Sequence, residues 1–448
     1  MKKITIMLLA AGFLFSCKKK KDDIPAPVNF TVSDFAASIP ENPNAGQPLG
    51  TVNAATNSGT LSFSITTQTP AGSIEINAAT GELKVTDSTK FNFETNTSVT
   101  ATVQVTNGGV NKTATVTLAV TDKPFGMVYT YAGTGTAGNS EGTISTASFT
   151  SPGYMVFDPS GNQYVVSGQH KIRKITPGGI VTTFAGNDVS GDVDATGTAA
   201  RFNVIAQMVC DAGGNLFVAD VVNHKIKKIT PAGVVTTIAG SGVAGYTDGN
   251  GTAAQFNRPN SLVMDAAGNL YAGDFLNYRI RKITQAGVVT TLAGSGVAGF
   301  LNGTGAAARF RGMAGMTIDG AGNIYLGEIS NWVIRKITPA GVVTTFAGAG
   351  TPGTTDGPGN TATFHSPGYL AIDQSGNIFV TDYGSHVIRK VTPAAAVTTF
   401  AGTVGSGGFI NAFGTNAKFT SPGGLAFDTN GFLYVSDAGN NVIRKIAD

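Results

Sequence analysis

One passage of sequence recurs six times between Ser151 and Asp448, and this repetition restricts the possible folds more than any other feature of the chain. Its anchor aspartates are 53, 54, 54, 54 and 55 residues apart. They are Asp158, Asp211, Asp265, Asp319, Asp373 and Asp428. A unit that repeats this regularly folds as one supersecondary element that buries its apolar surface against its neighbours. The repeat therefore indicates an architecture, although it names neither a ligand nor a reaction.

Each repeat contains four short β-like runs separated by Gly-rich turns. In the third repeat these runs cover residues 260–264, 269–273, 278–283 and 288–293. Four strands per unit are typical of a propeller blade, so six units predict six blades. The sixth repeat ends without the Val-Thr-Thr-Phe-Ala-Gly strand that closes the other repeats. Residues 128–133 have a similar sequence. We expect this early segment to become the outer strand of the last blade and to remove an open sheet edge.

The sequence of the repeat resembles that of NHL repeats. The segment that matches best is Asn223-His224-Lys225-Ile226-Lys227-Lys228-Ile229. The resemblance extends over residues 126–448 and implies a six-bladed NHL-type β-propeller closed by an N-terminal strand. Because propellers serve as scaffolds, receptors and enzymes alike, this resemblance predicts a fold and leaves the activity open.

The first residues resemble an export signal. Lys2 and Lys3 precede an apolar run over residues 4–15, which is too short to span a bilayer as a helix. The run ends at Cys17 in a stretch that resembles a bacterial lipobox, so residues 1–17 are interpreted as a lipoprotein signal peptide with lipidation at Cys17. An ordinary signal peptide with an incidental cysteine is the alternative.

A charged tether, residues 18–27, follows this cysteine. It resembles the segment after the lipidated cysteine in surface-exposed lipoproteins of Bacteroidetes-type bacteria. This resemblance implies an outer-membrane lipoprotein that is attached to the membrane by its lipid anchor and lies at the cell surface. The periplasmic face of the outer membrane is the alternative location.

Residues 28–124 are rich in Thr and Val and show alternation with period two. The clearest runs cover residues 61–65, 99–105 and 114–120, and the last two are joined by the hairpin signal Asn107-Gly108-Gly109. This pattern predicts an Ig-like β-sandwich with seven antiparallel strands. The whole chain is therefore expected to be all-β, with the sandwich preceding the propeller.

Part of the sandwich, residues 74–83, resembles the Phe-x-Ile-Asp-x-x-Thr-Gly-x-Ile stretch of cadherin-like repeats. That resemblance implies one calcium ion held by Glu41, Glu94 and Asp122. Calcium takes six to eight oxygen ligands, and asparagines stand at two positions where the family has aspartates. A calcium-free spacer is therefore the alternative interpretation of this domain.

A ring of acids follows the second strand of five repeats. Because strands in a blade are antiparallel, these acids lie on the same face as the long connections between blades, where function concentrates. The acids are Asp220, Asp274, Glu328, Asp382 and Asp437, with Ser167 in the first repeat. A variable slot nearby holds His170, His224, Tyr278, Trp332, His386 and Asn441.

Carboxylates accept hydrogen bonds and ring faces cover apolar C–H surface, so this face suits sugar hydroxyls or a basic peptide. The alternative is that the acids only cap turns through bonds to backbone amides. In that case Tyr278 and Trp332 are the better ligand-binding candidates.

These features favour a non-catalytic recognition and adhesion scaffold whose long-connection face binds an extracellular glycan or protein. With 13% charged residues and a net charge of +3, the chain lacks the basic field expected of a nucleic-acid binder. The alternative is a metal-dependent lyase or hydrolase that uses the central channel, because His170, His224 and His386 share one slot and neutral imidazoles bind zinc. Calcium-dependent cohesion between cells through the cadherin-like domain is a third hypothesis.

Overall fold

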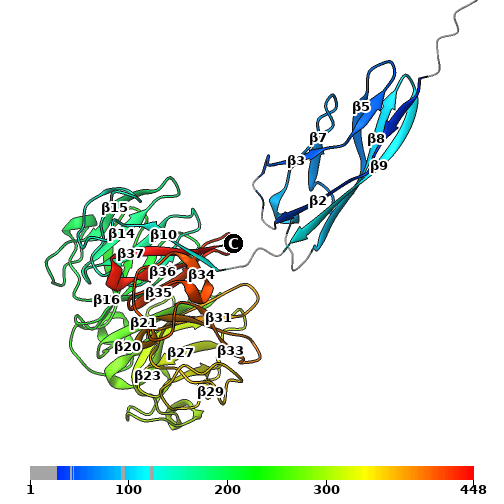
Figure 1. Ribbon diagram of the computed structural model, residues 1–448. Coiled ribbons are helices and arrows are strands. Elements are labelled where there is room, and N and C mark those ends of the chain that lie inside the picture. The colour runs from blue at the N-terminus through cyan, green and yellow to red at the C-terminus, as the bar shows by residue number, and fades with distance from the viewer. Residues whose placement is uncertain (1–27, 41–42, 44, 92–95, 122–125, 448) are drawn as a thin grey trace, which may run out of the picture. The chain divides into compact units, whose positions relative to one another are not determined.

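The chain forms two compact units, Met1–Lys123 and Pro124–Asp448. The computed structural model describes residues 28–40, 43, 45–91, 96–121 and 126–447 (Figure 1). Both units are built from β-strands, and the described residues contain short 3-10 turns but no α-helix. Within those residues, no helical segment has the length and apolar character needed to cross a membrane.

The first unit places its core between two main sheets, ordered β2-β9-β8-β5 and β3-β7-β6, with a separate short pair β1-β4. Leu83 of one sheet and Val103 and Leu118 of the other belong to a single buried cluster. One 3-10 turn, η1 (Ser88–Lys90), follows the seventh strand. The strands are β1 (Phe30–Val32), β2 (Phe35–Pro40), β3 (Pro48–Thr51), β4 (Ala54–Thr56), β5 (Ser62–Thr69), β6 (Ile74–Ile76), β7 (Glu82–Val85), β8 (Ser98–Asn107) and β9 (Val110–Thr121).

The hairpin expected in this unit is present, whereas the expected strand count and direction are wrong. Strands β8 and β9 pair up to Asn107 and Val110, and the turn residues Gly108 and Gly109 have φ of +56° and +85°, which glycine adopts without strain. The described residues of this unit hold nine strands rather than seven, and β2 runs parallel to β9. Alternation specifies which side chains are buried, such as Ile39 of β2, but it does not specify the direction of pairing.

The second unit is a β-propeller. Among its described residues the strands form six antiparallel sheets (Figure 1). The first strand of each sheet contacts the first strand of the next sheet, and the first strand of the last sheet contacts that of the first, which closes the ring.

The four main strands of each sheet run from the first strand, at the central channel, to the fourth strand, at the outside. They are β12 (Met155–Phe157), β13 (Gln163–Ser167), β14 (Lys171–Ile175) and β15 (Ile180–Gly186); β16 (Ile205–Cys210), β17 (Leu216–Asp220), β18 (Lys225–Ile229) and β19 (Val235–Ala239); β21 (Pro259–Met264), β22 (Leu270–Asp274), β23 (Arg279–Ile283) and β24 (Val288–Ala293); β26 (Met313–Ile318), β27 (Ile324–Glu328), β28 (Val333–Ile337) and β29 (Val342–Ala347); β30 (Pro367–Ile372), β31 (Ile378–Asp382), β32 (Val387–Val391) and β33 (Val397–Ala401); β35 (Pro422–Phe427), β36 (Leu433–Asp437), β37 (Val442–Ala447) and β10 (Met127–Ala132).

Four of the sheets gain a two-residue edge strand from the connection that precedes them, and 3-10 turns occur in connections and in turns between strands. The edge strands are β11 (Gly142–Thr143), β20 (Gly249–Asn250), β25 (Gly303–Thr304) and β34 (Ala412–Phe413). The 3-10 turns are η2 (Gly197–Ala199), η3 (Gly251–Ala253), η4 (Phe275–Asn277), η5 (Gly305–Ala307), η6 (Tyr383–Ser385), η7 (Gly414–Asn416) and η8 (Ala438–Asn440).

The last sheet is completed by the strand that begins the unit. Strand β10 pairs antiparallel with β37, with Val128 opposite Ile446, as the sequence predicts (Figure 1). Val128 is fully buried in a cluster that also contains Phe379 and Leu433. This pairing joins the two ends of the second unit and satisfies the backbone groups that β37 would otherwise expose at a sheet edge.

A phenylalanine is buried at the start of every sheet and packs between that sheet and the preceding one. Phe202, for example, lies in a cluster with Tyr164 of the first sheet and Val218 of the second. Each ring also lies 5.2 to 5.6 Å from the buried cation on the third strand of its own sheet. The rings are Phe149, Phe202, Phe256, Phe310, Phe364 and Phe419. Burying such a side chain contributes about 1.5 to 3 kcal/mol, so this residue binds neighbouring sheets together.

Candidate functional site

The antiparallel order of strands places two kinds of segment on one face of the propeller. These are the turns between the second and third strands and the connections from each fourth strand to the next sheet, and we call this side the long-connection face. The turns that follow the first and third strands lie on the opposite face.

The acids of the predicted ring are on the long-connection face, but all five side chains are fully buried. In the third sheet, Asp274 accepts hydrogen bonds from the backbone N of Asn257 (2.7 Å), Nδ2 of Asn277 (2.7 Å) and Nη1 of Arg281 (2.9 Å). Asp437 has the same three kinds of partner. The other acids, Asp220, Glu328 and Asp382, likewise accept a backbone N–H and face a buried Lys or Arg. This geometry favours the structural alternative over direct contact with a ligand.

Burial raises the pKa of every carboxyl in this ring, and hydrogen bonds and the neighbouring cations only partly offset it. The pKa of Asp220 rises to about 6, because desolvation outweighs the hydrogen bonds from Asn223 and Asn203 and the charge of Lys227. The nearest cation is Lys227 Nζ at 3.6 Å, which is farther than Arg281 Nη1 lies from Asp274.

Several slot residues connect neighbouring sheets. The slot residues of the second to sixth repeats have left-handed backbone conformations, with φ of +52° to +60°. His224 Nδ1 accepts a hydrogen bond from the backbone N of Arg258 (3.0 Å), and His386 Nδ1 accepts one from Ser421 N (3.1 Å). Asn441 Oδ1 accepts the corresponding bond in the last sheet. These imidazoles therefore have a structural role at the joints between sheets.

The described part of the chain contains no group of three or more His, Cys, Asp or Glu side chains with the spacing of a metal site. The predicted calcium ligands Glu41, Glu94 and Asp122 lie outside the described residues, as does the predicted lipidation site Cys17.

A cavity of about 470 Å³ opens on the long-connection face at the mouth of the central channel, and we call it the mouth cavity. Its wall comes from the first strands of five sheets, and its rim comes from the turns after β22, β27 and β31. The lining residues are Ala206, Asn260, Phe275, Met313, Ala314, Ile329, Ser366, Gly368, Tyr369, Thr381, Tyr383 and Pro422. None of these side chains carries a charge, and three of them are aromatic. Tyr278 and Trp332, which are half-buried, are not among the lining residues.

The channel below this cavity is filled by side chains one residue deeper along the first strands. Gln207 of the second sheet reaches the fourth sheet, where its Oε1 accepts from Met316 N (2.9 Å) and its Nε2 donates to Met316 O (2.7 Å). The same Nε2 donates to the hydroxyl of Tyr154 (3.0 Å), whose ring centroid lies 5.7 Å from that of Tyr369. A Cβ at Gly315 would come within 2.8 Å of Tyr369 Cα, so this glycine makes room for the tyrosine.

These contacts make the mouth cavity a cup rather than the entrance of an open tunnel. The rim of the cup was missed by sequence reasoning, although it has a signal. Phe275, Ile329 and Tyr383 each follow a ring acid directly, and Ile329 and Tyr383 are 41% and 52% exposed. The signal is the recurrence of a large apolar residue at this turn position in three neighbouring sheets, because clustered exposed apolar residues mark binding sites.

No family model matches the chain. NHL repeat-containing protein 2 from Bos taurus is 27% identical over 336 residues, which cover 66% of this chain and 46% of that protein. The chain thus spans about half the length of the curated relatives of this name.

Solved structures show the same fold over nearly the whole chain. A protein of unknown function from Bacteroides thetaiotaomicron superposes with a TM-score of 0.61 and 17% identity, covering 95% of this chain and 99% of that one. An auxiliary nutrient binding protein from Bacteroides ovatus has a TM-score of 0.60 and 16% identity, covering 93% and 97%. The chain is thus similar in sequence to NHL repeat-containing protein 2, and the solved structures share its β-propeller fold.

Proposed function

We propose that the protein is a non-catalytic recognition scaffold whose six-bladed propeller binds an uncharged glycan in the mouth cavity. The observation that carries this proposal is the composition of the cup. Phe275, Tyr369 and Tyr383 offer ring faces to apolar C–H surface, and Asn260 and Thr381 offer polar groups to hydroxyls. A lining without charge favours a neutral ligand over a charged one, because an ion would lose its hydration without gaining a partner.

Two other observations support a binding role. Similarly folded Bacteroides proteins include auxiliary nutrient binding proteins, although the likeness is at 16% identity and concerns the fold. The ring carboxylates were candidates for ligand contact, and the slot histidines were the metal ligands of the enzyme alternative. Both are engaged in bonds that hold the sheets and their turns. A binding cup on a rigid ring is consistent with both observations.

The attachment of this scaffold is part of the proposal. The lipobox-like stretch ending at Cys17 and the charged residues 18–27 support a lipid anchor in the outer membrane, with the scaffold at the cell surface. The first unit then acts as a cadherin-like spacer. Calcium binding by Glu41, Glu94 and Asp122 stays a prediction, which a calcium titration of the protein tests directly.

The glycan proposal is tested by screening the protein against neutral and charged oligosaccharides and measuring dissociation constants for the hits. Tyr383→Ala should weaken binding of a neutral glycan about tenfold or more, since loss of the ring removes about 1.4 kcal/mol. Tyr246→Ala is the matched control, because Tyr246 is a 62% exposed tyrosine on the long-connection face but outside the cup.

Trp332→Ala distinguishes the cup from the slot residues. Weaker binding in this variant, with normal binding by Tyr383→Ala, would place the ligand on the slot instead. A preference for charged oligosaccharides, or equal binding by the Tyr383 and Tyr246 variants, would refute the proposed site.

A further inference from the structure

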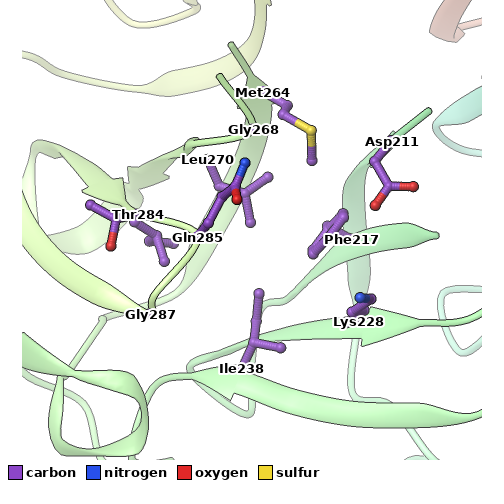
Figure 2. Close-up of a pocket in the computed structure, with 11 residues that line it drawn as sticks. Asp211, Phe217, Lys228, Ile238, Met264, Gly268, Leu270, Thr284, Gln285 and Gly287 are labelled. Carbon is purple, nitrogen blue, oxygen red and sulfur yellow. The ribbon is translucent and has the colours of Figure 1, made fainter. Parts of the chain in front are cut away.

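A second cavity, of about 410 Å³, lies between the second and third sheets (Figure 2). Its walls include Asp211, which follows β16, and Gln285, which lies in the turn between β23 and β24. These turns belong to the face opposite the long connections, and the cavity shares no lining residue with the mouth cavity. We call it the inter-sheet pocket.

The pocket exists because the second sheet departs from the repeat. In three other sheets a phenylalanine on the fourth strand packs on an aromatic ring of the second strand, at centroid distances of 4.8 to 4.9 Å. The second sheet has Ile238 at this position, beside Phe217. The first strand of the third sheet contributes Met264, whereas at the joint between the fifth and sixth sheets Phe427 packs 5.3 Å from Phe379. Two smaller side chains thus leave open a volume that aromatic rings fill at the joint between the fifth and sixth sheets.

Another substitution in the second sheet leaves a carboxylate oxygen with one donor fewer. In four sheets a tyrosine hydroxyl donates to Oδ2 of the anchor aspartate, as Tyr164 does to Asp158 (3.1 Å). Phe217 replaces that tyrosine and has no hydroxyl. Oδ2 of Asp211 still accepts from Asn215 Nδ2 (2.8 Å), which leaves acceptor capacity toward the pocket.

A cation lies on the same wall. Lys228 Nζ is 5.7 Å from the centroid of the Phe217 ring, and no acid among the described residues is within ion-pair distance of it. Figure 2 shows Asp211, Phe217 and Lys228 along one side of the pocket, with Leu270, Thr284 and Gln285 on the other. The pocket therefore combines a carboxylate, an ammonium group and an apolar interior.

We propose that the inter-sheet pocket binds a free α-amino acid with an apolar side chain. The ammonium group of the ligand donates to Asp211, its carboxylate pairs with Lys228, and its side chain packs against Phe217, Ile238 and Met264. This charge complementarity selects a zwitterion, because an amine alone leaves Lys228 unpaired and a carboxylate alone faces Asp211 without a donor. The site is independent of glycan binding at the mouth cavity.

The test is calorimetric titration of the full chain with L-leucine, with 3-methylbutylamine and 4-methylpentanoate as analogues that each lack one charged group. We expect saturable binding of one leucine with a dissociation constant below about 1 mM, and binding at least about tenfold weaker for each analogue. Ile238→Phe should abolish binding, because it introduces the ring that three other sheets hold at this position. Unchanged fluorescence of Trp332 and unchanged glycan binding would show that this variant is folded.

Lysine variants provide a matched pair. Lys228→Met should weaken leucine binding at least about tenfold. Lys390→Met should bind like the parent, because Lys390 lies at the same 5.7 Å from Phe379 in a sheet whose joint is filled by aromatic rings. The proposal is overturned if leucine does not bind saturably, if either analogue binds as tightly as leucine, or if the Ile238→Phe variant binds like the parent.

Discussion

Replacing Asp274 by alanine is the sharpest test of the buried acid ring. The change removes the acceptor for three donors that are positioned around it, namely the backbone N–H of Asn257, the amide of Asn277 and one branch of the Arg281 guanidinium. The side chains of Asp274, Asn277 and Arg281 are buried in the third sheet and its turn, so water cannot simply take the place of the carboxylate.

The expected cost follows from these contacts. Removing one partner of a buried ion pair typically costs about 3 to 5 kcal/mol. Arg281 keeps Asp248 through Nη2 at 2.7 Å and the carbonyl of Gln255 through Nη1 at 2.9 Å, so its charge is not left alone. Burial also raises the pKa of Asp274, which means that the ionised carboxylate itself carries a desolvation cost. We therefore expect the lower end of the range, a loss of about 3 kcal/mol.

Asp274→Ser is the matched variant, because the first sheet already has a serine at this position. Ser167 Oγ accepts the backbone N–H of Thr150 at 3.0 Å, in place of the carboxylate. A serine at 274 should preserve this one bond, worth about 1 kcal/mol, and lose the contacts with Asn277 and Arg281. Its expected loss is about 2 kcal/mol, intermediate between the parent and the alanine variant.

Urea unfolding followed by tryptophan fluorescence measures these differences. The chain has a single tryptophan, Trp332, which lies in the fourth sheet and reports on the propeller rather than on the first unit. The order of stability should be parent, serine variant, alanine variant. A loss below about 1 kcal/mol for Asp274→Ala would refute a structural role for the acid and would restore the ring as a candidate for ligand contact.

The remaining predictions concern pH and ring closure. Asp220 has a folded-state pKa of about 6, above the ordinary value of 3.8, so ionising it costs the folded state free energy as the pH rises from about 4 to about 6. The parent should lose up to about 3 kcal/mol relative to Asp220→Asn across this window, at about 1.4 kcal/mol per unit of pKa; parallel unfolding curves at pH 4 and 7 would contradict this. Val128→Ala should lower the free energy of unfolding of the propeller by about 2 kcal/mol, because two buried methyl groups leave a void in the closing strand. The exposed Val297→Ala is the control, and equal effects of the two changes would argue against closure through β10.

The strands of the propeller were predictable because their signals are local. The fourth run of the third repeat was expected at residues 288–293, and β24 covers Val288–Ala293. Alternating apolar residues and Gly-rich turns act within a few residues, so each repeat predicts its own strands. The pairing of β10 with β37 was also predictable. The last repeat lacks its fourth strand, and residues 128–133 have the sequence of that strand although they lie far away along the chain.

The role of the ring acids was less accessible. An aspartate at the end of a strand has the same sequence signal whether it faces solvent or an arginine. At Asp437 the deciding contact is with Arg444, which lies on the next strand of the same sheet and is fully buried. Four repeats contain both the acid and the arginine, but only the folded sheet shows that these two residues face each other.

By itself, the sequence determined the all-β class, the strands of each repeat and the strand that completes the last sheet. These features depend on hydrophobic periodicity, on turn residues and on the comparison of one repeat with another. The tertiary structure alone decided where a ligand can enter. The mouth cavity combines residues as distant as Ala206 and Pro422. The inter-sheet pocket arises where Ile238 replaces the phenylalanine of three other sheets and Met264 replaces the phenylalanine found in the last sheet. Such cavities depend on the volumes that remain after the ring closes, and those volumes are set by packing between units that no single repeat encodes.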